Sequence, residues 1–189
     1  MLLLVLGLVL FLGVHSVSIF AEPFRDRMAA KSELGWKAAY GVASLLGIWL
    51  IVKGYGAARM DPVWLWTPPA WLSHLSALLL LPVFVFFVAS YLPGRISDTL
   101  KHPQLVAVKL WAAAHLLVNG TLADLVLFGS FLAWAVADRI SLKRRTPREL
   151  PAAPRRAAND FIAIGVGLVA YLVFVFWAHR ALIGVAPFG

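Results

Sequence analysis

Long apolar segments alternate with short polar links along the whole chain. Six segments are apolar enough to form membrane helices, at about 2–20, 36–55, 71–92, 103–118, 121–140 and 161–179. Most approach the roughly 20 residues that an α-helix needs to cross about 30 Å of hydrocarbon. The period-two alternation of a β-barrel strand is missing. The pattern therefore predicts an all-α polytopic membrane bundle with six transmembrane helices, forming a single domain over residues 1–189.

Proline and glycine refine these helices. Pro82, in the middle of the third segment, removes a backbone hydrogen bond and predicts a kink. Pro103 suits the first turn of the fourth helix, and Asn119-Gly120 ends that helix in a tight turn. The fourth and fifth helices are therefore expected to form a hairpin whose first arm, about 24 Å long, either spans the membrane or re-enters it. Small residues give the sixth helix a smooth face for close packing: Gly165, Gly167 and Ala170.

Composition supports the membrane class. Hydrophobic residues make up 61% of the chain, charged residues only 14%, and the mean hydropathy is +0.83, which is too apolar for a soluble domain of 189 residues. The first segment resembles the apolar region of a signal peptide. No basic residue precedes it and no convincing cleavage site follows it, so we expect it to remain as the first helix. Cysteine is absent, which excludes disulfides and thiolate ligands.

Charge predicts the orientation. The net charge is +8, but the basic residues lie in the links between apolar segments and no nucleic-acid-binding module is apparent. Fourteen of the 17 Lys and Arg residues follow the first, third and fifth helices, and only Lys53, Arg59 and Arg180 fall on the other side. By the positive-inside rule, those three links are cytoplasmic and both termini face outward.

Two histidines are the strongest candidates for chemistry. His15 and His115 fall at similar depth on different helices, and two neutral imidazoles are the usual means of holding a haem iron within a membrane bundle. Trp111 and Asn119 lie one helical turn on either side of His115, so this face offers a flat ligand an aromatic ring and an amide. Lys109 is expected to extend to the cytoplasmic surface or to pair with a haem propionate. Candidate partners for the second ring nitrogens are Ser16, Ser18 and Asn119.

A purely structural interpretation stands beside this one. A histidine in an apolar helix can form an interhelical hydrogen bond that contributes about 1 kcal/mol. His74 and His179 lie near the outward surface, where interfacial anchoring explains them, and His102 belongs to the start of the fourth helix. The aspartates at helix ends favour capping or solvation over catalysis: Asp124, Asp138 and Asp160.

The chain resembles the NnrU family of bacterial membrane proteins. The resemblance rests on the run from His102 to Leu105, on Lys109-Leu110-Trp111, and on the segment from His115 to Gly120. Further matching positions are His15-Ser16, Gly35-Trp36-Lys37 and Leu127-Phe128-Gly129. It implies a location in the bacterial inner membrane, which with the charge pattern makes both termini periplasmic. It also implies an association with denitrification and nitric oxide reduction.

The plant 15-cis-zeta-carotene isomerases, which are membrane haem b proteins, are also similar. Their histidine ligand positions correspond to His15 and His115 of this chain, whereas Ala112 replaces a cysteine. Ligand exchange through a thiolate is therefore excluded. Membrane methyltransferases of the isoprenylcysteine type are a more distant resemblance, because only His102-Pro103 of their motif remains.

Together these features predict a haem b protein with iron ligands at His15 and His115 and a redox or accessory role in nitrogen-oxide respiration. A haem-dependent isomerase of a polyene and a cofactor-free assembly factor for a respiratory complex are the alternatives. The expected partners are the lipid bilayer and either a hydrophobic small molecule or a respiratory complex, and not nucleic acid.

Overall fold

The computed structural model describes residues 1–146, 148 and 152–187, and its regular structure within these residues is helical. One isolated antiparallel bridge joins Trp64 to Thr121, and no strand forms in the described ranges. Four helical segments are long and apolar enough to cross a membrane: Leu2–Phe20, Glu33–Ala58, Leu72–Ala89 and Asn159–Ile183. The predicted all-helical membrane character is therefore confirmed. Because four described helices, and not six, have the length and composition of a membrane span, the predicted number of spans is not confirmed.

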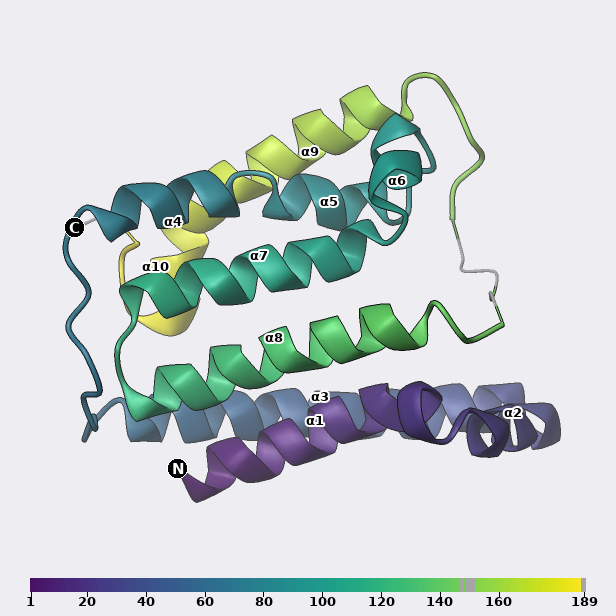
Figure 1. The fold of residues 1–189 in the computed structure, drawn as a ribbon, viewed down its shortest axis with the longest axis horizontal. Helices are drawn as coiled ribbons and strands as arrows, with labels where there is room; N and C mark the ends of the chain where they lie inside the picture. The colour runs from purple at the N-terminus through teal and green to yellow at the C-terminus, as the bar shows by residue number, and fades with distance from the viewer. Residues whose placement is uncertain (147, 149–151, 188–189) are drawn as a thin grey trace. The chain divides into compact units, whose positions relative to one another are not determined.

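The described residues form two compact units (Figure 1). The first unit comprises Met1–Thr67 and Asn119–Arg145, and it contains α1 (Leu2–Phe20), α2 (Glu22–Lys31), α3 (Glu33–Ala58) and α8 (Leu122–Ser141). The second unit comprises Pro68–Val118 and the described part of Thr146–Gly189. Its elements are α4 (Leu72–Leu80), α5 (Val83–Ala89), α6 (Arg95–Leu100), α7 (Pro103–Val118), α9 (Asn159–Val173), the π-helical turn η1 (Phe174–Ala178) and α10 (His179–Ile183).

The bounds of three helices agree with the apolar pattern to within one residue. α1 and α7 match the predicted segments, and α8 begins one residue later than expected. α3 starts earlier, because the hydroxyl of Ser32 accepts a hydrogen bond from the Gly35 N–H at 3.0 Å and caps the helix. α8 also ends one residue later than expected, at Ser141, and residues 147 and 149–151 of the link that follows lie outside the described residues.

Two short helices occupy links that the pattern left irregular. α2 lies in the polar connection after α1, with Pro23 in its first turn, where the missing N–H costs no hydrogen bond. α6 follows Gly94, and the Ser97 hydroxyl accepts a hydrogen bond from the Gly94 N–H at 2.9 Å. Both helices are polar, so hydrophobic periodicity could not reveal them.

Pro82 breaks the third apolar segment, as predicted. α4 ends at Leu80 and α5 begins at Val83, so the segment consists of two helices joined by a turn at Leu81 and Pro82. The sixth predicted helix is continuous from Asn159 to Ile183 but contains the η1 turn. Its small-residue face is confirmed in part, because a Cβ at Gly167 would lie 2.5 Å from the Val85 backbone of α5 whereas one at Gly165 would meet nothing within 4 Å.

In the first unit, α1 and α3 pack at backbone distance. A Cβ added to Gly54 would lie 2.1 Å from the Leu4 backbone nitrogen, and one added to Gly47 would lie 2.9 Å from the backbone of Phe11. Gly7 of α1 is equally close to α3, with 2.6 Å to the Ile51 nitrogen. α8 packs mainly on α1. The glycines therefore determine how closely the two N-terminal spans approach, as small residues commonly do in membrane helix pairs.

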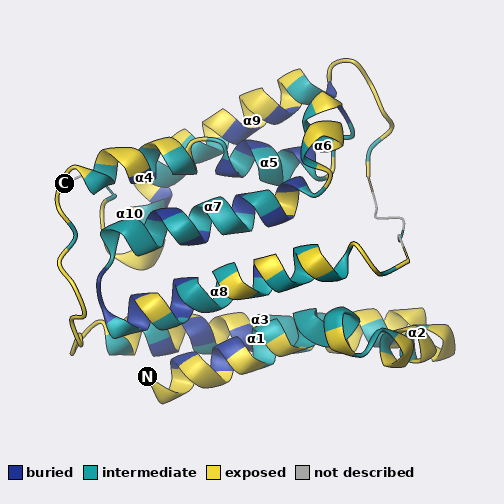
Figure 2. Cartoon of the chain, in the orientation of Figure 1, coloured by how far each residue is buried: buried dark blue, intermediate teal, exposed yellow. Residues whose placement is uncertain are grey.

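Many residues along the candidate spans are exposed (Figure 2), and large apolar residues are among them. Val9 of α1, Leu45 of α3 and Val169 of α9 are each more than 60% exposed. So much exposed apolar surface is incompatible with water but is typical of side chains that contact lipid. The structure thus supports the membrane assignment independently of helix length.

Replacing Gly54 by alanine tests the α1–α3 contact. Gly54→Ala places a methyl group 2.1 Å from the Leu4 backbone, so α1 must move away, and overpacking of this kind costs about 1–3 kcal/mol. We expect a lower thermal midpoint in detergent, followed by circular dichroism. Gly56→Ala is the matched control in the same helix, because its Cβ meets nothing within 4 Å. Equal midpoints for the two variants would contradict close packing at Gly54.

Candidate functional site

His15 lies within an aromatic cluster of the first unit. Its ring stacks on Phe11 of the same helix with 4.1 Å between ring centroids. Tyr40 of α3 lies 4.9 Å away, and Trp134 of α8 meets the imidazole edge-on at 5.9 Å. Three helices thus contribute to the surroundings of one imidazole. The α1–α3 packing described above places Tyr40 beside it.

The hydrogen bond of His15 fixes its ring. Nδ1 lies 2.6 Å from the carbonyl oxygen of Phe11, four residues earlier in α1. A carbonyl oxygen only accepts, so Nδ1 must carry the proton and donate it. In the neutral ring, Nε2 then keeps a lone pair, and no hydrogen-bond partner reaches it from any described residue.

His115 repeats this arrangement in the second unit. Its Nδ1 lies 2.8 Å from the carbonyl oxygen of Trp111, again four residues earlier in the same helix. The two rings are in contact, with centroids 5.4 Å apart. As in His15, the contact places the proton on Nδ1, so Nε2 is the unprotonated nitrogen of the neutral imidazole.

Each histidine therefore uses its Nδ1 proton in a hydrogen bond to a backbone carbonyl, as metal-ligating histidines often do. Such residues usually donate the second ring N–H to a carboxylate or a backbone carbonyl, which orients the ring and raises its basicity as a ligand. The predicted partners Ser16, Ser18 and Asn119 are not those that bond Nδ1, because the helix backbone itself supplies the acceptor in both cases. The described residues contain no cluster of three or more His, Cys, Asp or Glu side chains that could hold a metal ion.

Of the other predicted site residues, only Trp111 has a described contact with His115. Trp111 is in ring contact with it, as its spacing predicted. Lys109 is half-buried on α7. Asn119 follows the last residue of α7 and belongs to the first unit, whereas His115 belongs to the second. Ala112, at the position of the cysteine in the isomerases, is fully buried.

Sequence reasoning missed the aromatic residues around His15. Phe11 could have been found, because it precedes His15 by the same four residues that separate Trp111 from His115. Tyr40 and Trp134 lie on other helices, so their proximity depends on tertiary packing. The indole N–H of Trp134 is buried and has no hydrogen-bond partner among the described residues, so this donor next to the imidazole is unsatisfied.

A separate polar cluster surrounds Asp124, which is only 4% exposed. One carboxylate oxygen accepts from the Tyr55 hydroxyl at 2.5 Å, and the other accepts from the backbone N–H and the hydroxyl of Thr121 at 2.9 and 2.6 Å. Asp124 also receives a capping box, since its own N–H donates to Thr121 at the start of α8. The predicted capping role is confirmed, but the carboxylate is buried and not solvated.

These features define an all-helical membrane protein with one imidazole in each unit that is hydrogen-bonded through Nδ1 to the backbone of its own helix. The family model described as NnrU protein matches residues 3–187. The chain belongs to the NnrU family, as the resemblance in its histidine, tryptophan and glycine positions predicted. No curated protein and no solved structure matches the chain.

Removing the Asp124 carboxylate should destabilise the first unit. Asp124→Ala leaves the Tyr55 and Thr121 hydroxyls without their acceptor, and a buried unsatisfied group costs about 1–3 kcal/mol. We expect a lower thermal midpoint in detergent. Asp61→Ala, at an exposed position of the same unit, is the control and should leave the midpoint unchanged. A midpoint for Asp124→Ala equal to that of the control would show that the cluster contributes nothing to stability.

Proposed function

We propose that this NnrU-family protein binds haem b with His15 and His115 as the iron ligands. Its role would be redox or accessory in nitrogen-oxide respiration, at the bacterial inner membrane. When bound, the haem iron would supply a one-electron redox centre within the membrane. The link to nitrogen-oxide respiration comes from the association carried by the family.

The observation that carries the proposal is the matched hydrogen bonding of the two imidazoles. In each ring Nδ1 donates to the carbonyl four residues earlier, at 2.6 and 2.8 Å, so the proton is on Nδ1 and Nε2 is the nitrogen that would bond to iron. Neutral imidazoles with an oriented second nitrogen are the ligand type that haem iron uses in membrane bundles. Two imidazoles of this kind are therefore chemically suitable ligands for haem iron.

The surroundings of His15 support the same role. Phe11, Tyr40 and Trp134 provide an aromatic environment, and the unpartnered Trp134 N–H offers a hydrogen-bond donor to a bound group. A buried donor without an acceptor costs free energy unless something else satisfies it. A cofactor bearing oxygen atoms would remove that cost, whereas an imidazole that only packs would not.

Absorption spectra of the purified protein test haem binding. We expect protein from haem-replete cells, in detergent, to show a Soret band and the spectrum of a low-spin iron with two imidazole ligands. His15→Gly and His115→Gly should each lose haem or convert it to the high-spin form, because one ligand is gone. Added imidazole should restore the low-spin spectrum in each variant, a result that a merely structural histidine would not give.

His74→Ala is the matched control, since His74 lies on α4 and has no proposed role at the iron. Folding is followed by circular dichroism in every variant. Folded wild-type protein without a Soret band would contradict the haem proposal and favour the cofactor-free assembly factor. A full low-spin spectrum in both glycine variants would reassign the ligands, with His179 the next candidate because its Nδ1 lies 2.6 Å from the Val185 carbonyl oxygen.

We further propose the six-span topology with both termini in the periplasm. It rests on the basic links and on the apolar α7 and α8, although α7 is only 16 residues long. Because the chain has no cysteine, single introduced cysteines report on one position each.

Cysteine labelling in intact cells and in inverted vesicles tests this topology. Arg144→Cys and Asp61→Cys lie at exposed positions after α8 and α3, and we expect them to react from opposite sides of the membrane. Arg27→Cys in α2 should react from the same side as Arg144→Cys. Reaction of Arg144→Cys and Asp61→Cys from one side would refute the proposed number of spans.

A further inference from the structure

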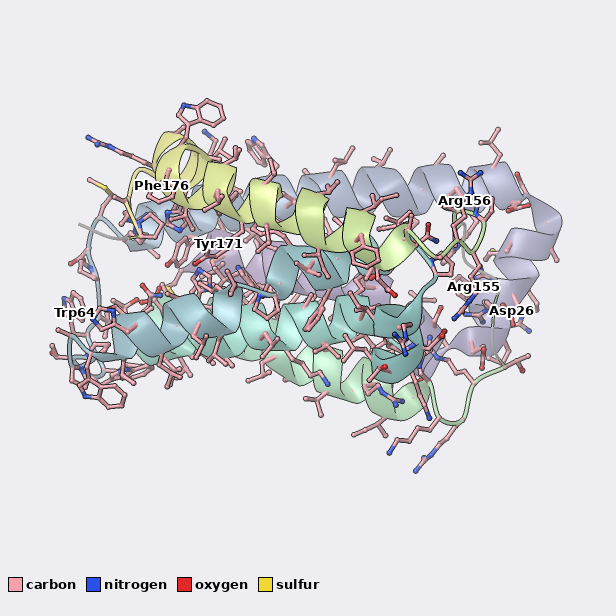
Figure 3. All side chains as sticks on the ribbon, turned by 90° about the horizontal axis from the view of Figure 1, so that it is seen from above. Asp26, Trp64, Arg155, Arg156, Tyr171 and Phe176 are labelled. Atoms are coloured by element: carbon pink, nitrogen blue, oxygen red, sulfur yellow. The ribbon has the colours of Figure 1, made fainter. Side chains whose placement is uncertain are left out.

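The polar end of the second unit contains a hollow lined by three arginines. Arg95, Arg155 and Arg156 border it together with Gly94, Asp160 and Phe161. The hollow lies where the last candidate span begins, because α9 starts at Asn159. Figure 3 labels Arg155 and Arg156 on the segment that leads into this helix. The hollow is therefore at the depth of the lipid headgroups.

Hydrogen bonds join the two segments that form the hollow. The Asp160 carboxylate accepts from the backbone N–H groups of Arg95 and Ile96 at 2.9 and 3.1 Å. The Asn159 side chain, only 2% exposed, donates to the carbonyls of Pro93 and Pro154 at 2.9 and 3.1 Å. The arginines thus project from a backbone that is fixed before any ligand arrives.

Gly94 makes this arrangement possible. A Cβ at this position would lie 2.4 Å from the nearer carboxylate oxygen of Asp160. Any other residue would therefore push the carboxylate away from the N–H groups of Arg95 and Ile96. The close approach of Asp160 to this segment explains the glycine.

The charges of the hollow do not balance. Arg155 forms a two-point ion pair with Asp98, with 3.0 Å between Nη1 and Oδ1, and this contact lowers the pKa of the Asp98 carboxyl. The Asp160 oxygens are taken up by backbone N–H groups. Arg95 and Arg156 are exposed, and their guanidinium groups have no ion-pair partner among the described residues. Three guanidinium groups against two carboxylates leave a net charge of +1.

We propose that this hollow binds the phosphodiester headgroup of an anionic phospholipid. A phosphodiester carries one negative charge, which matches the unbalanced charge, and guanidinium groups bind phosphate oxygens through paired hydrogen bonds. Phe161, 77% exposed in the first turn of the span, offers apolar contact to the start of the acyl chains. A zwitterionic lipid would bring an ammonium group to the arginines and is disfavoured. Basic residues at the end of a membrane span commonly attract anionic lipids.

Native mass spectrometry of the full-length protein in detergent tests the proposal. The protein is titrated with phosphatidylglycerol, with phosphatidylcholine of the same acyl chains, and with inorganic phosphate. We expect phosphatidylglycerol to bind preferentially. The double variant Arg95→Ala/Arg156→Ala should weaken phosphatidylglycerol binding about 30-fold, because two charges near the membrane surface are removed.

Lys143→Ala/Arg144→Ala is the matched control, since it removes two exposed basic residues outside the hollow and should leave the preference intact. The charge-conserving variant Arg95→Lys/Arg156→Lys should keep the preference but bind more weakly, because lysine lacks the paired donors. Circular dichroism establishes that each variant is folded.

Three outcomes would overturn the proposal. Equal binding of the two lipids would exclude recognition of the anionic headgroup. Equal losses in the alanine variant and in the control would indicate attraction by overall charge alone. Inorganic phosphate that displaces phosphatidylglycerol completely would assign the hollow to a soluble anion. The haem spectrum, measured on the same samples, is independent of all three.

Discussion

Polar side chains inside a membrane must find their hydrogen-bond partners within the protein, because the hydrocarbon offers none. In this protein the helix backbone often supplies the partner. Ser44 donates to the Tyr40 carbonyl at 2.7 Å and Ser90 donates to the Phe86 carbonyl at 2.9 Å, each four residues earlier. His15 and His115 use the same solution with Nδ1. For a histidine, this hydrogen bond places the proton on Nδ1 and not on Nε2. The constraint that satisfies the serine hydroxyls therefore also sets the tautomer of both imidazoles.

The environment of His15 depends in turn on how closely α1 and α3 approach. The residues of α3 that contact α1 recur at intervals of seven, four and three, which is the spacing of one helix face: Tyr40, Gly47, Ile51 and Gly54. Because Gly47 and Gly54 have no side chain, the backbones meet, and Tyr40 at the other end of the face lies beside His15. The pairing of α1 with α3 thus determines both the close packing near the start of α1 and the aromatic surroundings of His15 near its end.

Much of the fold could be predicted from the sequence, because apolar runs and prolines act locally. The bounds of α1 and α7 and the break at Pro82 follow from them. α2 and α6 could not be predicted, since they are short and polar and depend on caps or on contacts with other segments. The seven-residue spacing of Gly47 and Gly54 places both glycines on one face of the helix, which could have predicted the close packing.

Only part of the candidate site could be predicted from the sequence. Both histidines and Trp111 were identified from their positions in apolar helices, and Trp111 contacts His115 as its spacing implied. Tyr40 and Trp134 were not, because their approach to His15 requires the pairing of α1 with α3 and α8. Side chains were the predicted acceptors of the Nδ1 protons, whereas the structure has backbone carbonyls in this role. Every helical residue has such a carbonyl, so the sequence does not distinguish it.

The most direct test of the central claim is the tautomer of the two rings. Solid-state NMR of haem-depleted protein in lipid, with ¹⁵N-labelled histidine and with His15→Ala and His115→Ala used for assignment, reports which nitrogen carries the proton. We expect a protonated Nδ1 and an unprotonated Nε2 in both residues. A proton on Nε2 in either residue would contradict it, because that nitrogen could not then serve as an iron ligand without losing its proton.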